Sequence, residues 1–66
     1  MKINLNGTST SVDQNSLISS VIKNLKFSDN GLVTLLNENI IPKEKRNNTI
    51  LNENDSLEII SFVSGG

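Results

Sequence analysis

The chemistry open to this chain is concentrated at its carboxyl end. A β-branched, alternating segment from Leu57 to Val63 runs directly into Ser64-Gly65-Gly66. Because glycine lacks a Cβ, a Gly-Gly end can enter a narrow channel and adopt backbone angles that other residues avoid. The α-carboxylate of Gly66 is therefore the one reactive group that the rest of the molecule could be built to present.

The composition argues against catalysis by side chains. The 66 residues include no cysteine and no histidine. Without cysteine there is no disulfide framework, thiolate chemistry or zinc site to expect, and without histidine the commonest metal ligand and general base are missing. The carboxylates form no pair suited to acid–base work, and we interpret Asp55 as a turn former that bonds its own backbone. We expect no catalytic residue, no metal and no bound cofactor, so the chain is not predicted to be an enzyme.

Length and charge restrict the class of protein further. Residues 1–66 suffice for one domain with one core. The net charge of −1 gives no electrostatic reason to expect nucleic acid. No apolar run approaches the roughly 20 residues of a membrane span, and the amino end lacks the apolar region of a signal peptide. These features predict a small soluble intracellular protein without nucleic-acid or membrane partners.

The amino-terminal segment predicts a pair of strands. Met1 to Leu5 alternate in polarity, as expected of a half-buried strand. Asn6-Gly7 is the strongest short signal for a hairpin turn. Thr8 to Val12 would be the return strand. It is rich in β-formers but polar, so we place it at a sheet edge, where no charged side chain would guard it against pairing with other chains.

A helix is predicted next. Asp13 or Ser16 can cap its start, and it should stop near Phe27, before the turn cluster at 28–31. Its expected apolar stripe comprises Leu17, Val21 and Leu25, with Ile18 and Ile22 beside them.

The second half predicts three more extended segments. Residues 32–36 are apolar on both alternating faces, as expected of a central strand covered on two sides. After a turn at 37–39, Ile40-Ile41-Pro42 is a short extended piece that Pro42 ends or places at an edge. Residues 43–48 are polar and read as a loop or a single helical turn.

Ile50 and Leu51 are expected to plug the core ahead of a turn at 52–55. In the last strand, Leu57 and Ile59 lie on one face, and Ile60 and Phe62 on the other. The order of elements describes an α+β roll in which the first and last strands lie side by side and parallel. One helix covers only one sheet face, so the second apolar face needs another explanation.

Over its whole length the sequence resembles a known family, the ubiquitin-like sulfur carrier proteins of thiamine (thiazole) biosynthesis (the ThiS family). The matching features are Asn6-Gly7, the helix stripe, Asn37 with Ile40-Ile41-Pro42, the segment from Asn54 to Ile59, and Gly65-Gly66. The resemblance implies a β-grasp (ubiquitin-like) roll, a mixed four- to five-stranded sheet packed on one helix. It also implies a flexible Gly-Gly tail at about residues 63–66.

The chain departs from the family pattern at three positions. Lys43 follows Pro42 where the family usually has arginine, and a lysine is a point charge rather than a bidentate fork. Arg46 stands near the place of a common aromatic. Asn54 replaces a usual glycine, which is tolerable if that residue adopts the αL conformation.

The resemblance further implies chemistry that other proteins perform. An adenylyltransferase related to ubiquitin-activating enzymes (ThiF-type) would use ATP to adenylate the Gly66 carboxylate. Sulfur from a persulfide would then give a thiocarboxylate, and a thiazole synthase (ThiG-type) would take that sulfur. The expected location is the cytoplasm, or the plastid stroma for a plastid-encoded chain.

Two interpretations remain for Val33, Leu35, Ile60 and Phe62: ordinary surface residues, or a docking face for these partners. We favour docking, with Phe62 as the best anchor. Glu58 is either an exposed strand residue or a salt-bridge partner of the activating enzyme. Lys43 to Arg46 are most simply a solvated loop of mixed charge, and a partner role stays open.

Two other functions remain open. The chain could be the small subunit of molybdopterin synthase, which ends similarly, although its length and its lack of prolines before the tail argue against this. It could also be a ubiquitin-like protein modifier joined to lysines.

Overall fold

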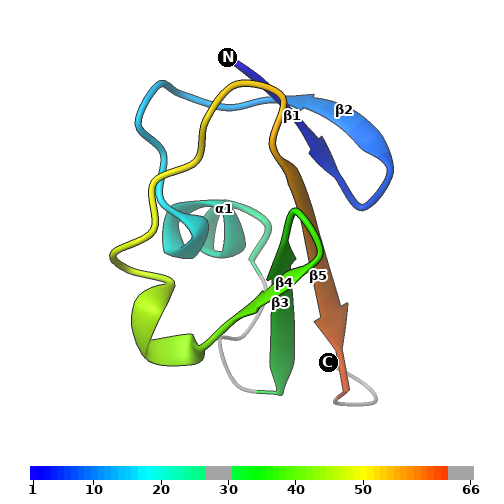
Figure 1. Cartoon of the computed structure of the whole chain (residues 1–66), viewed down its shortest axis with the longest axis vertical. Helices are drawn as coiled ribbons and strands as arrows, with labels where there is room; N and C mark the ends of the chain where they lie inside the picture. Colours follow the sequence, from blue (N-terminus) through cyan, green and yellow to red (C-terminus); the bar gives the residue numbers. More distant parts are fainter. Residues whose placement is uncertain (27–30, 63–66) are drawn as a thin grey trace.

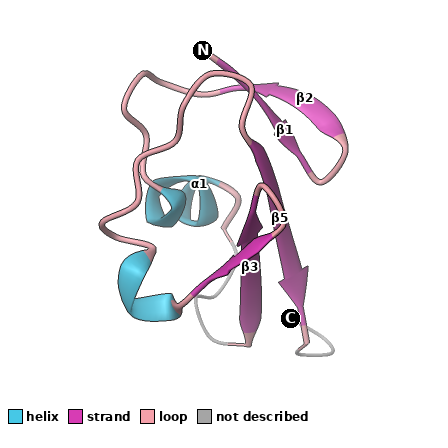
Figure 2. Ribbon diagram, viewed as in Figure 1, coloured by secondary structure: helices cyan, strands magenta, loops and turns pink. Residues whose placement is uncertain are grey.

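One helix lies against one face of a five-stranded sheet in the computed structural model, which describes residues 1–26 and 31–62 (Figure 1). The elements in chain order are β1 (Lys2–Leu5), β2 (Thr8–Ser11), α1 (Ile18–Asn24), β3 (Leu32–Leu36), β4 (Asn39–Ile41), the 3-10 turn η1 (Lys43–Lys45) and β5 (Ser56–Ser61). Figure 2 shows the short η1 and α1 on the same side of the strands.

The strand order β2-β1-β5-β3-β4 confirms the predicted β-grasp roll. The first and last strands are parallel neighbours, with Asn4 opposite Ser56 and Leu5 opposite Leu57. The other three pairings are antiparallel, so the sheet is mixed. β2 lies at an edge, as predicted. The last strand, β5, lies at the centre of the sheet, and residues 32–36 form β3, an interior strand between β5 and β4.

Both hairpins use two-residue turns with positive φ, the geometry that matches strand twist. Asn6 and Gly7 have φ of 49° and 86° between β1 and β2. Asn37 and Glu38 have φ of 50° and 72° between β3 and β4. The first turn was expected from its Asn-Gly pair. The second has no glycine, and Glu38 accepts a conformation that side chains usually avoid.

The predicted cap of the helix is wrong. Neither Asp13 nor Ser16 makes a side-chain cap bond to α1, and the Ser16 hydroxyl instead donates to the Asp13 carbonyl at 2.7 Å. A later segment of the chain satisfies the start of α1 instead. The N–H groups of Ile18 and Ser19 donate to the carbonyls of Thr49 and Arg46 at 3.2 and 3.1 Å. Because these carbonyls satisfy the first donors, a side-chain cap is not needed.

The helix is also shorter, and turned relative to the predicted stripe. It ends at Asn24, and the predicted end at Phe27 lies outside the described residues. Ile18, Val21 and Ile22 are buried, whereas Leu25 caps the helix end and is 41% exposed. The buried residues of α1 are therefore three and four positions apart, whereas the predicted stripe advanced by four residues at each step.

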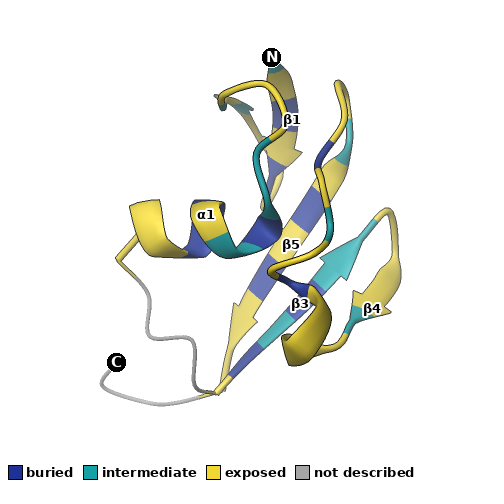
Figure 3. Ribbon diagram, turned by 90° about the vertical axis from the view of Figure 1, so that its left-hand side faces the viewer, coloured by how far each residue is buried: buried dark blue, intermediate teal, exposed yellow. Residues whose placement is uncertain are grey.

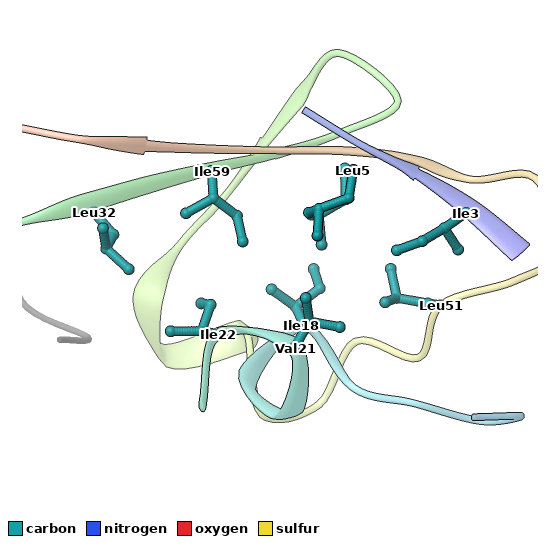
Figure 4. Close-up of a cluster of buried hydrophobic side chains, with 9 residues drawn as sticks. Ile3, Leu5, Ile18, Val21, Ile22, Leu32, Leu51 and Ile59 are labelled. Carbon is teal, nitrogen blue, oxygen red and sulfur yellow. The ribbon is translucent and has the colours of Figure 1, made fainter. Parts of the chain in front are cut away.

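The core fills the space between α1 and the inner face of the sheet (Figure 4). Its buried members are Ile3, Leu5, Ile18, Val21, Ile22, Leu32, Leu51, Leu57 and Ile59. Leu51 plugs the core as predicted, but Ile50 is 51% exposed. The extended backbone at this point pairs with Leu17, and alternation along an extended chain points only one of two neighbouring side chains inward.

Arg46 is the largest departure from the predicted solvated loop. Only 4% of it is exposed. Its guanidinium lies under β3, where Nε donates to the Thr34 hydroxyl at 3.3 Å and Nη2 to the Leu32 carbonyl at 2.6 Å. Thr34 is itself fully buried, and its hydroxyl donates a hydrogen bond to the Ile41 carbonyl at 3.1 Å. The buried guanidinium of Arg46 thus ties the segment that contains η1 to the sheet. The remaining charged residues of the segment, Lys43 to Lys45, are exposed.

Candidate functional site

The outer face of the sheet, opposite α1, carries the candidate site. Figure 3 shows buried positions alternating with less buried ones along β3 and β5. The register places Val33 directly opposite Ile60, and Leu35 between Glu58 on one side and Ile40 on the other. Directly opposed residues share a face, so these side chains lie together. Residues 32–36 are therefore covered on one side by the core, and within the described chain they are not covered on both sides as predicted.

Five apolar residues form one surface on this face, which we call the apolar patch: Val33, Leu35, Ile40, Ile60 and Phe62. Val33 and Leu35 are half-buried. Ile40, Ile60 and Phe62 are 69%, 40% and 72% exposed. The structure thus brings together the four apolar residues that sequence analysis singled out for docking. A contiguous exposed apolar surface of this kind is characteristic of interaction sites.

Sequence analysis missed Ile40, which it assigned only to a short extended piece. The signal was available in the spacing. A two-residue turn at Asn37 and Glu38 makes Leu35 and Ile40 opposed neighbours. This turn could be predicted only by allowing two residues other than glycine to adopt positive φ.

The rest of the outer face is polar. Lys2 and Asn4 of β1 oppose Ser11 and Ser9 of β2, and all four residues are exposed. Glu58, also exposed, stands between the two halves because its strand neighbour is Leu35. The outer face therefore changes from apolar at β4 and β3 to polar at β1 and β2, with Glu58 at the border.

The end of β5 is held in place up to Phe62. The Phe62 N–H donates to the Gly31 carbonyl at 2.8 Å, which continues the pairing with β3 beyond Ser61. Gly31 itself has φ of 74°, a conformation suited to glycine. The predicted reactive residues Gly65 and Gly66, and the predicted strand end at Val63, lie outside the described residues. The last described residue before them is thus a fixed, exposed aromatic at the rim of the apolar patch.

Two loop interpretations are confirmed. The Asp55 carboxylate accepts from the Asn52 N–H at 2.7 Å and from the Asn37 amide at 3.1 Å, so it organises turns. Asn54 has φ of 69°, the αL conformation that its replacement of glycine requires. Among residues 1–26 and 31–62, no three His, Cys, Asp or Glu side chains gather as metal ligands would. In the same part of the chain no helix has the length and apolar character needed to cross a membrane.

A mixed five-stranded sheet grasping one helix, with an apolar patch beside the strand that leads to Gly-Gly, defines a ubiquitin-like β-grasp protein. The model of the ThiS family matches residues 3–66, and the chain belongs to this family. Membership places it among the small ubiquitin-like sulfur carriers of thiamine biosynthesis rather than among enzymes.

Solved structures show the same fold. The crystal structure of the thiamine biosynthesis protein (ThiS) from Geobacter metallireducens superposes with a TM-score of 0.83 at 23% identity, covering 100% of both chains. The NMR solution structure of a thiamine biosynthesis protein from Geobacter metallireducens gives 0.82 at 23% identity, covering 100% of this chain and 88% of that one. No curated protein matches the chain significantly.

Proposed function

We propose that the chain carries sulfur on the carboxyl group of Gly66 for the synthesis of the thiamine thiazole. An activating enzyme of the ThiF type would transfer AMP from ATP to the Gly66 carboxylate and release pyrophosphate. A carboxylate is a poor electrophile, and the mixed anhydride makes its carbon attackable. The outer sulfur of a persulfide then attacks this carbon and displaces AMP, which gives an acyl disulfide. A thiol of the activating system cleaves the S–S bond and becomes part of a disulfide, which releases the thiocarboxylate for a ThiG-type thiazole synthase. The carrier binds no cofactor in this scheme, and ATP belongs to the partner.

Family membership is the observation that carries this proposal, and the terminal Gly65-Gly66 supports it. Residues 63–66 would act as a flexible arm, because two glycines without Cβ atoms fit a channel that larger residues block. The paired backbone up to Phe62 gives that arm a fixed root. We place the reaction in the cytoplasm, or in the plastid stroma for a plastid-encoded chain.

The apolar patch is the proposed docking surface for the activating enzyme and the synthase. It lies beside the root of the arm, so a partner seated on it would receive Gly66 in its active site. Phe62 is the proposed anchor because it is a large aromatic that is 72% exposed in the free protein, and buried aromatics dominate interface energies. Glu58 is exposed at the border of the patch, and in this proposal it would pair with a cation of the activating enzyme.

The test is an intact-mass measurement. The protein is incubated with ATP, a ThiF-type enzyme, a persulfide donor and a thiol reductant, and replacement of one oxygen by sulfur should raise its mass by about 16 Da. Omission of ATP is the control. A folded wild-type chain that gains no sulfur under these conditions would contradict the proposal.

Partner capture separates thiamine synthesis from the other two functions. Wild-type protein should retain a thiazole synthase. Retention of a large molybdopterin synthase subunit would instead indicate molybdopterin synthesis. A lysine-linked adduct that survives denaturation and thiol would indicate a protein modifier.

A further inference from the structure

β2 presents an open backbone edge on the side of the sheet away from the apolar patch. It is the first strand in the sheet order, and the described residues place no strand beyond it (Figure 1). Met1 and Val12 exchange both of their backbone hydrogen bonds at 2.9 Å. Antiparallel pairs alternate between bonded and non-bonded, so the N–H and C=O groups of Ser9 and Ser11 point away from β1. This edge can accept another strand.

The side chains of this edge do nothing to prevent such pairing. Native edges are commonly guarded by lysine, proline or a bulge. Thr8-Ser9-Thr10-Ser11 contains neither residue, and its register with β1 runs without interruption. The edge is therefore compatible with pairing to an extended segment.

A groove runs alongside the edge on the inner side of the sheet. It has a volume of about 200 Å³ and lies between β2 and α1. Its apolar lining includes Leu5, Val12, Val21 and Leu25, and Asp13 lies on its rim. Leu25 is 41% exposed there, although the predicted helix stripe placed it in the core. The groove is far larger than one water needs, so it can receive aliphatic side chains.

We propose that β2 and this groove bind an extended peptide segment of a partner protein by strand addition. Main-chain bonds to Ser9 and Ser11 would hold the peptide, and pockets beside an edge select alternate side chains. Aliphatic residues at every second position would enter the groove, while residues between them would face the exposed hydroxyls of Ser9 and Ser11. A lysine or arginine at one end would meet the carboxylate of Asp13.

A second copy of this chain fits the site less well than a peptide. A two-fold pair of β2 strands would bring serine and threonine hydroxyls together over four residues. Stable interfaces bury roughly 1,200–2,000 Å², and a pairing so short and polar falls short of this.

The experiment uses isotope-labelled full-length protein and the capped hexapeptide Lys-Val-Thr-Val-Thr-Val. Peptide addition should shift the amide signals of Ser9 and Ser11, slow their hydrogen exchange and perturb Leu25. Signals of Val33 and Ile60 in the apolar patch should stay in place. No change at Ser9 and Ser11 with millimolar peptide, or changes concentrated at Val33 and Ile60, would overturn the proposal.

Matched variants sharpen the test. Ser9→Pro removes the outward donor without touching a bond to β1, and edge strands tolerate such a proline. It should weaken binding by about tenfold, whereas Ser9→Ala should retain it.

Leu25→Asp alters a side chain that is 41% exposed and should also weaken binding by at least about tenfold. If Ser9→Pro does not fold, peptide binding by Leu25→Asp tests the proposal in its place. Unchanged binding by folded Leu25→Asp, or a concentration-dependent shift of Ser9 without peptide, would refute the peptide site. The second result would assign the edge to a second copy.

Discussion

The side-chain amide of Asn6 pairs with both backbone groups of Ile59. The Ile59 N–H donates to Asn6 Oδ1 at 2.8 Å, and Asn6 Nδ2 donates to the Ile59 carbonyl at 3.3 Å. β1 ends at Leu5, so the amide takes the place of one more strand residue beside β5. The turn after the first strand therefore secures the middle of the last one.

Replacement of Asn6 by glycine should destabilise the protein by about 1–3 kcal/mol, because the two polar groups of Ile59 lose their partner. Glycine keeps the positive φ of 49° without strain. Asn15→Gly is the matched control, since Asn15 also has positive φ (62°) and an exposed side chain. Urea unfolding measures both variants. Equal stabilities would show that the amide pairing contributes nothing.

Arg46→Met should lower the free energy of unfolding by about 1.5–3 kcal/mol. Methionine fills similar space but leaves the Leu32 carbonyl without a charged donor. In a domain of this size such a loss lowers Tm by about 4–8 °C per kcal/mol. Lys45→Met, one residue away and exposed, serves as the control. Calorimetry decides, and a more stable Arg46→Met would mean that burying the cation costs more than its hydrogen bonds return.

Ile60→Glu should reduce the kcat/KM of adenylation at least about tenfold, because it places a charge in the centre of the proposed docking surface. Ile50→Glu makes the same change at an isoleucine that is similarly exposed, 51% against 40%, but lies outside the apolar patch. It should leave kcat/KM unchanged. Pyrophosphate release with saturating ATP measures the rate. Equal losses in the two variants would argue against docking on the patch.

Deletion of Gly66 should abolish sulfur loading and change the unfolding free energy by no more than about 0.5 kcal/mol. The reactive carboxylate would then sit on Gly65, one residue short of the attacking group. Intact mass reports the loading, and thermal unfolding reports the stability. A deletion that unfolds the protein would assign the last glycine a structural role.

Much of the fold could be predicted because its strongest signals are local. Alternation marked β1 and β5, Asn-Gly marked the first hairpin, and the polar return strand marked the β2 edge. Asparagine at Asn6, Asn37 and Asn54 adopts positive φ, as expected of a residue that replaces glycine in loops.

The remaining features depend on contacts between segments far apart in sequence. The helix needed no side-chain cap because carbonyls some thirty residues later satisfy its first donors. Arg46 resembled one more charged loop residue, and its burial depends on partners distant in sequence, among them the Thr34 hydroxyl and the Leu32 carbonyl. Ile40 lies in the apolar patch because of the turn at Asn37 and Glu38, and these two residue types do not by themselves predict a two-residue turn.

The position of β5 between β1 and β3 also has a consequence for biosynthesis. The ribosome makes β5 after β1 and β3, and both halves of the sheet assemble on it; pairings between distant segments form late. A prematurely terminated chain that lacks β5 would leave β1 and β3 without their shared neighbour. Such a fragment should remain unfolded and be degraded rather than compete with the finished carrier for the activating enzyme.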